Sequence, residues 1–124
     1  MRELTTHHTN ECNKAITVDV CEDESGEPHG YTARWRDSDD MSMEIDLWFQ
    51  HGPIAEVGTN GLTNELLLAI VADRLAHFQR GKFACVENQM ALDHVTEALR
   101  TLEDRTKRRT AQGVEGTHQP DPEE

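Results

Sequence analysis

The chain has 124 residues and a formal net charge of −12; 35% of its residues are hydrophobic and only 5% are aromatic. This length predicts a single domain. Because so few residues are apolar, one chain can form only a small hydrophobic core, so we expect oligomerisation. The acidic charge argues against a general DNA- or RNA-binding protein, and there is no run of about 18 apolar residues that would predict a membrane span.

The N-terminal segment, residues 1–14, is polar and without periodicity, so we expect it to be disordered. It also lacks the apolar stretch of a secretory signal. The three cysteines, Cys12, Cys21 and Cys85, are odd in number and form no C-x-x-C pair. This argues against a disulfide framework or a zinc ribbon and favours a reducing cytoplasm.

Residues 15–50 predict a small antiparallel sheet. Apolar and polar residues alternate in three segments, 15–21, 31–36 and 43–49, which is the pattern of strands with one covered face. The segments are separated by turn-forming stretches, Glu22–Gly30 and Asp37–Asp40. Short connections of this kind favour a meander.

Residues 51–112 predict a helical hairpin. Thr63 is expected to cap a first helix that ends at Gly81 in the left-handed conformation, and a second helix is expected from about Ala84 to about Arg109. The short connection requires the helices to fold back antiparallel. Residues 113–124 are expected to form a glycine-containing segment and an acidic tail. The predicted fold class is α+β: an N-terminal antiparallel meander, then a long two-helix hairpin, in an oligomer.

The charge is unevenly distributed. Residues 74–109 hold eight basic and five acidic side chains, a net +3, whereas the rest holds four basic and 19 acidic ones, a net −15. A confined basic patch on an acidic protein suits a small anionic ligand better than a polyanion. A solvated helix face with mixed charges explains the same pattern.

The connection between the two helices is a candidate ligand site. The start of the second helix offers free N–H groups and the positive end of a helix dipole, and Arg80 and Lys82 add charge beside it. Phe78 and Phe83 offer flat surfaces for stacking, and Asn88 offers an amide donor and acceptor. This combination fits a phosphate and a base, although the two phenyl rings could simply close the end of the helix pair.

A second polar group lies at the other end of the second helix. It consists of the basic run 105–109 and the segment 113–118, where glycines let backbone amides approach an anion. Basic residues at a helix C-terminus also have a purely structural explanation. Asn88 and Arg105 are 17 residues apart, about 25 Å along one helix, so a small ligand contacts both only if a second chain supplies one of them.

The chain resembles a known family at an ordered string of motifs spread over roughly residues 45–119. The motifs are Phe49-Gln50-His51-Gly52-Pro53, Val57-Gly58-Thr59-Asn60-Gly61-Leu62-Thr63-Asn64-Glu65, Asp73-Arg74-Leu75, Phe78-Gln79, Phe83-Ala84-Cys85-Val86-Glu87-Asn88, Arg105-Thr106 and Gly113-Val114-Glu115-Gly116-Thr117-His118. They are similar to the phage anti-defence sponge family, which shares a helical hairpin and counters the Thoeris and CBASS systems. The N-terminal strands, with Asp23-Glu24, Pro28-His29 and Tyr31, resemble the anti-Thoeris branch.

The resemblance implies a phage- or prophage-encoded protein of the bacterial host cytoplasm that is not an enzyme and needs no cofactor. Such proteins sequester cyclic ADP-ribose isomers without cleaving them, and some also hold cyclic di- or trinucleotides. Some members are hexamers, and both a dimer and a hexamer stay open here. No polymer of DNA or RNA, membrane or metal is implied.

The resemblance also implies site residues. Phe78 and Asn88 match the aromatic and amide positions of the ADP-ribose pocket, with Lys82 and Phe83 beside them, and Arg105 matches an arginine of the binding surface. A second nucleotide site is implied by Arg109, Gly116, Thr117 and His118. Lys82 replaces an expected proline, and Val86 and Gln112 replace expected arginines, which weakens the expected phosphate contacts.

Two other functions fit the residues. A nucleotide hydrolase would use His77, His94, Asp73, Asp93 or Glu97, although no H-E-x-x-H motif, H-D dyad pattern or P-loop is present. A protein-binding inhibitor of a host factor would use the acidic surface, which solubility alone also explains.

Overall fold

The computed structural model describes residues 1–120 and divides the chain into two compact units, Met1–His51 and a second unit that begins at Gly52. The first holds the sheet and the second holds the helical hairpin. Among the described residues, none of the helices combines the length and apolar content needed to cross a membrane.

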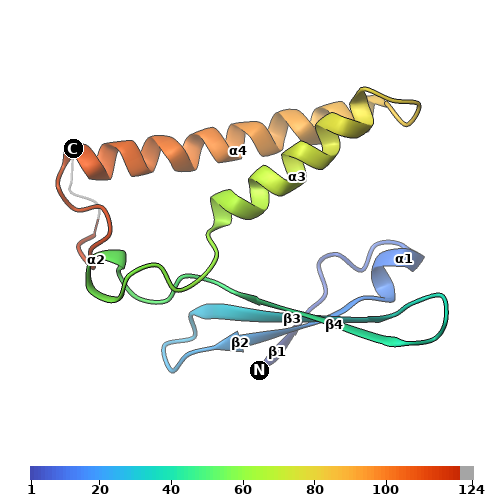
Figure 1. Cartoon of the computed structure of the whole chain (residues 1–124), viewed down its shortest axis with the longest axis horizontal. Coiled ribbons are helices and arrows are strands. Elements are labelled where there is room, and N and C mark those ends of the chain that lie inside the picture. Colours follow the sequence, from blue (N-terminus) through green and yellow to red (C-terminus); the bar gives the residue numbers. More distant parts are fainter. Residues whose placement is uncertain (121–124) are drawn as a thin grey trace. The chain divides into compact units, whose positions relative to one another are not determined.

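The first unit is a four-stranded antiparallel sheet. Its strands are β1 (Arg2–Leu4), β2 (Thr17–Glu22), β3 (Pro28–Arg36) and β4 (Ser42–Trp48), and they lie in chain order (Figure 1). The α+β class and the antiparallel meander of the three longer strands are therefore confirmed. The β2–β3 turn is fixed by Asp23, whose carboxylate accepts hydrogen bonds from Ser25 and from the Glu27 N–H. The Ser25 bond is the largest of the influences that lower the pKa of Asp23.

The N-terminal segment differs from the disorder expected for residues 1–14. Strand β1 pairs with β2 in the register Arg2 to Val20 and Leu4 to Val18. Helix α1 (Glu11–Lys14) is capped by the side chain of Asn10, the residue before it. Both elements are too short to show a period in the sequence. Pairing with the β2 edge supplies the order that the segment's own composition does not.

One face of the sheet is apolar, as the alternation predicts. The register places Val18, Ala33 and Ile45 in one row and Val20, Tyr31 and Leu47 in the next. Val20 is completely buried, whereas Ile45 is 48% exposed. The opposite face carries polar pairs such as Thr32 with Asp46, 2.8 Å apart. The covered core of this unit is thus small.

The second unit contains α2 (Ile54–Val57), α3 (Asn64–Gln79) and α4 (Val86–Ala111). Helices α3 and α4 lie side by side and run in opposite directions, joined by a short turn (Figure 1). Thr63 caps α3 as predicted, with its hydroxyl accepting the Leu66 N–H at 3.1 Å. Gly81 does not have the predicted left-handed conformation, because α3 already ends at Arg80 in a right-handed cap.

The helix pair buries few side chains completely. Half-buried apolar residues follow the helical period in both helices: Leu67, Leu68, Ala72, Leu75, Ala76, Ala91, Leu92, Val95, Leu99 and Leu102. Other apolar side chains stay in solvent, including Ile70 at 52% and Met90 at 54% exposed. In a single chain the hairpin therefore keeps a substantial apolar surface uncovered.

The structure describes the segment after α4 as far as Pro120. Gly113 and Gly116 both have positive φ, and the backbone folds back so that Gly116 accepts the Ala55 N–H at 3.0 Å. The segment 113–118 thus packs on α2, and Val114 is buried. The end of the predicted acidic tail, residues 121–124, lies outside the described residues.

Candidate functional site

The turn between α3 and α4 is held by one glutamine. Gln79 at the end of α3 donates from Nε2 to the Cys85 carbonyl and accepts the Cys85 N–H on Oε1, both at 3.0 Å. Its amide also lies 3.3 Å from Oε1 of Gln89 on α4. This reciprocal pair gives residues 80–85, named the hairpin turn below, a fixed path between the helices.

The predicted aromatic residues meet at the hairpin turn. The rings of Phe78 and Phe83 are 6.2 Å apart and nearly perpendicular. A cation lies beside each ring: the Arg74 guanidinium carbon is 5.2 Å from the Phe78 centroid, and the Lys82 ammonium is 5.3 Å from that of Phe83. Arg74 is not among the site residues predicted from the sequence. Its position four residues before Phe78 on the same helix could have indicated this contact.

Asn88 lies in the first turns of α4, directly against the hairpin turn. Its side-chain amide reaches the Phe83 carbonyl at 3.4 Å, and its backbone N–H lies 3.4 Å from the sulfur of Cys85, which caps the helix. The N-terminal end of α4, a helix of 26 residues, thus lies next to the hairpin turn, where the Phe78 and Phe83 rings and their neighbouring cations are found. This arrangement can bind an anion and stack a planar group next to it.

The hairpin turn is an open surface in a single chain. Phe83 is 62% exposed, and the neighbouring Val86 is 70% exposed. Arg105 is exposed on α4, 17 residues beyond Asn88, at the helix's other end. The structure thus brings Phe78, Lys82, Phe83 and Asn88 together and leaves Arg105 apart from them.

The other predicted site residues gather where α4 ends. Arg109 is only 5% exposed; it donates to Glu115 at 3.1 Å and to the carbonyls of Val114 and Gln119. Thr117 donates its hydroxyl to the Val114 carbonyl, and His118 lies 3.5 Å from Glu56 of α2.

These contacts give the C-terminal residues a structural role. Arg109 holds the segment 113–119 in its folded-back path, so Gly116, Thr117 and His118 are positioned beside α2. Ligand binding by Gly116, Thr117 and His118 stays a prediction, and the contacts of Arg109 favour a role in positioning them.

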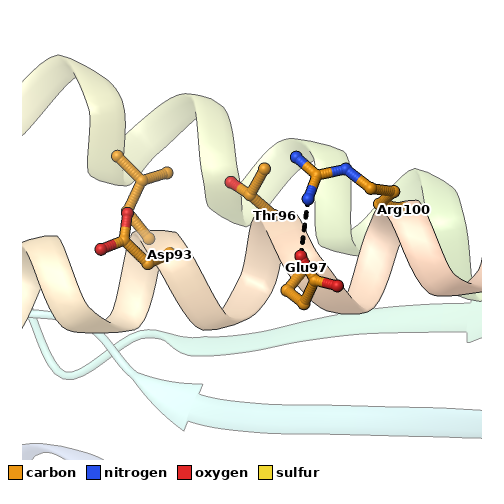
Figure 2. A pocket seen from close by; sticks show the side chains of 5 residues that line it. Asp93, Thr96, Glu97 and Arg100 are labelled. Atoms are coloured by element: carbon orange, nitrogen blue, oxygen red, sulfur yellow. Dashed lines mark hydrogen bonds and ion pairs between the residues drawn. The ribbon is translucent and has the colours of Figure 1, made fainter.

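Two of the acidic residues considered for hydrolysis, Asp93 and Glu97, are already paired with other side chains. Asp93 and Glu97 line a hollow of about 380 Å³ on α4 with Leu92, Thr96 and Arg100 (Figure 2). Glu97 is paired with Arg100 at 2.6 Å, and Asp93 accepts from Gln89 at 2.9 Å. His94 is not part of this lining. Two carboxylates against one guanidinium make the hollow a poor site for a phosphate.

Two comparisons place the chain among known proteins. The family model described as "Acb2/Tad1, hairpin domain" matches residues 41–106, more than half of the 124. A curated relative named "Thoeris anti-defense 1", from Bacillus phage SBSphiJ7, is 51% identical over 71 residues. Those residues are 57% of this chain and 50% of the relative, so the match spans about half of the relative's length.

The family match contains the whole hairpin turn. It includes Phe78, Phe83, Asn88 and Arg105 and ends before Arg109. The chain therefore belongs to the Acb2/Tad1 hairpin-domain family of phage anti-defence proteins, on its anti-Thoeris branch.

Proposed function

We propose that this protein is a Thoeris anti-defence sponge: it binds cyclic ADP-ribose isomers, the signals of that immune system, and holds them without cleaving them. The observation that carries the proposal is the match to the hairpin family across the residues gathered at the hairpin turn, together with the name of the curated relative. The site of action proposed is the cytoplasm of the bacterial host, and the gene is proposed to be carried by a phage or prophage.

The chemistry of the hairpin turn supports this ligand class. A cyclic ADP-ribose carries a planar adenine and a pyrophosphate. Phe78 and Phe83 can stack the base, while the start of α4, Lys82 and Arg74 place positive charge near the phosphates. Asn88 can read a polar edge of the ligand with its amide.

The proposed pocket is completed by a second copy of the chain. Phe83 and Val86 at the hairpin turn are exposed in one chain, and Arg105 lies about 25 Å from Asn88 along α4. A neighbouring hairpin laid against the exposed Ile70 and Met90 would cover apolar surface and bring its own Arg105 to the pocket. A dimer or a hexamer satisfies this requirement.

A second ligand site is proposed near the segment 113–118. Gly116, Thr117 and His118 would contact a cyclic di- or trinucleotide of the CBASS type. Arg109 would position this segment rather than touch the ligand, because its guanidinium is buried against Glu115 and the Val114 carbonyl.

Calorimetry with single variants tests the first site. Phe78→Ala and Asn88→Ala should each weaken binding of a cyclic ADP-ribose isomer at least about 100-fold, because each removes a stacking surface or a polar contact inside a closed pocket. Arg105→Ala should weaken it as well, and Arg100→Ala, a matched arginine on the same helix, should leave it unchanged.

The same sample distinguishes a sponge from a hydrolase. Heating the saturated complex should release the ligand with its mass unchanged, as measured by mass spectrometry. Recovery of a linear product would instead assign the protein to nucleotide hydrolysis. Wild-type affinity in both Phe78→Ala and Asn88→Ala would remove the hairpin turn as the site.

A further inference from the structure

Three potential metal ligands meet at one end of the sheet. Asp23 lies in the turn after β2, His29 is the second residue of β3, and His51 follows β4 by three residues. The Phe49 N–H donates to the His29 carbonyl at 2.8 Å, which continues the β3–β4 pairing toward His51. One donor atom from each of the three side chains lies within 4.8 Å of the others.

The donor set suits a divalent transition metal. Two imidazoles and a carboxylate are ligands of Zn²⁺ and its neighbours, and three protein ligands leave a fourth position for water or an anion. Bonds of about 2.1 Å in a tetrahedral site separate the donors by roughly 3.4 Å, so the three side chains need to approach by about an ångström or slightly more. Asp23 and His51 both lie outside the strands, where such an adjustment is easily made.

The carboxylate is already oriented for this role. Ser25 donates to Oδ1 of Asp23 through its backbone N–H at 2.9 Å and its hydroxyl at 2.6 Å, and the Glu27 N–H adds a third bond at 3.0 Å. Bonds of this kind around a ligating carboxylate fix its direction in metal sites.

A separate observation concerns His29. Its Nδ1 is buried and has no hydrogen-bond partner within the described residues. The ring lies 4.7 Å from that of His51 and 6.0 Å from that of Trp48. A buried ring nitrogen without a partner is unfavourable, and such groups call for an explanation such as a bound ion.

We propose that Asp23, His29 and His51 form a binding site for one divalent transition metal ion, with Zn²⁺ as the representative ion. The ion would join the β2–β3 turn to the last residue of the sheet unit. It would therefore stabilise a unit whose own apolar core is small. This proposal is independent of the nucleotide site, which lies in the other unit.

The test uses the whole chain of 124 residues without a polyhistidine tag, stripped of metal by a chelator. Calorimetry with Zn²⁺ should find about one ion per chain, and Co²⁺ should give the visible absorption of a low-coordinate site. Binding of Zn²⁺ should also raise the melting temperature of the sheet unit, followed by tryptophan fluorescence, since both tryptophans lie in that unit.

Two variants test the proposed ligands, and a third is the control. Asp23→Asn keeps a side-chain oxygen for the turn and His51→Gln alters an exposed residue, so both should fold, with circular dichroism as the check. Each should weaken Zn²⁺ binding at least about tenfold, since a ligand is removed. His94→Gln, an exposed histidine of α4, should bind as the wild type does.

The adjacent pair His7 and His8 is the main competing source of binding, because their rings lie only 4.2 Å apart. Binding that survives His51→Gln but disappears in a variant with both of these histidines changed to glutamine would overturn the proposal. Failure of the wild-type protein to bind Zn²⁺ or Co²⁺ would overturn it too.

Discussion

At the scale of single residues, Gly30 has a clear packing reason. The indole of Trp48 lies directly over it, so a Cβ added at Gly30 would collide with the ring atoms Cζ3 and Cε3. Gly30 is buried and its φ is not positive, so space rather than backbone conformation requires the glycine. The register that pairs Gly30 with Trp48 creates this requirement.

Gly30→Ala should therefore destabilise the sheet unit by about 1–3 kcal/mol, the usual range for overpacking. Urea unfolding followed by tryptophan fluorescence measures this directly. Gly81→Ala is the matched control, because its Cβ would meet only the Phe78 carbonyl at 3.9 Å. Equal stability of the two variants would contradict the packing assigned to Trp48.

The burial of Arg109 could not be predicted from the sequence pattern. The family resemblance implies that Arg109 belongs to a second nucleotide site. The structure buries Arg109, because the chain turns back at Gly113 and surrounds the guanidinium with Glu115 and two carbonyls. That burial depends on contacts with the segment that folds back after α4, and the periodicity of a helix gives no information about such contacts.

At the scale of elements, the hairpin turn depends on Gln79. Its amide makes two bonds with the backbone of Cys85, the residue that caps α4. A side chain from the end of one helix thus sets where the next helix begins. The same contacts fix the path of the backbone that carries Lys82 and Phe83.

Gln79→Ala should loosen this turn while leaving both helices formed. Removing both bonds should reduce local stability by about 1–3 kcal/mol, and hydrogen exchange of the Cys85 amide should accelerate accordingly. The neighbouring Arg80→Ala serves as the control and should leave that exchange rate unchanged. Unaltered protection of Cys85 in Gln79→Ala would show that the turn is held by something else.

The elements could be predicted where a period is long enough to be recognised. The alternation in 15–21, 31–36 and 43–49 identifies β2, β3 and β4, and the spacing after Thr63 identifies α3. Strand β1 and helix α1 have three and four residues, too few for any period. The predicted left-handed Gly81 is wrong because Arg80 already ends α3 with right-handed geometry.

Of the two proposed sites, the hairpin turn could be predicted from the sequence, whereas the metal site could not, because its residues are far apart in the chain. Phe78, Phe83 and Asn88 are close in sequence, so the hairpin turn brings them together. Asp23 and His51 are 28 residues apart, and only the register of β3 with its neighbours makes them adjacent. No motif spacing indicates such a cluster in advance.

At the scale of the whole molecule, the central feature is that the proposed ligand contacts lie at opposite ends of α4. The hairpin turn adjoins its N-terminal end, and Arg105 lies near its C-terminal end. Exposed apolar residues between them, such as Met90, remain uncovered in one chain. A pocket shared by two chains accounts for the separation and for the uncovered surface together.

Complementation between two weakly binding variants tests this shared pocket most directly. Asn88→Ala and Arg105→Ala, each of which should bind a cyclic ADP-ribose isomer only weakly alone, are unfolded together in equal amounts and refolded. Random assembly gives four kinds of pocket in equal amounts. One of them, with the turn of the Arg105→Ala chain and the arginine of the Asn88→Ala chain, has only wild-type residues. Calorimetry of the mixture should recover about a quarter of the wild-type sites at wild-type affinity. Mixed assemblies, verified by native mass spectrometry, that recover no sites would contradict a pocket built by two chains.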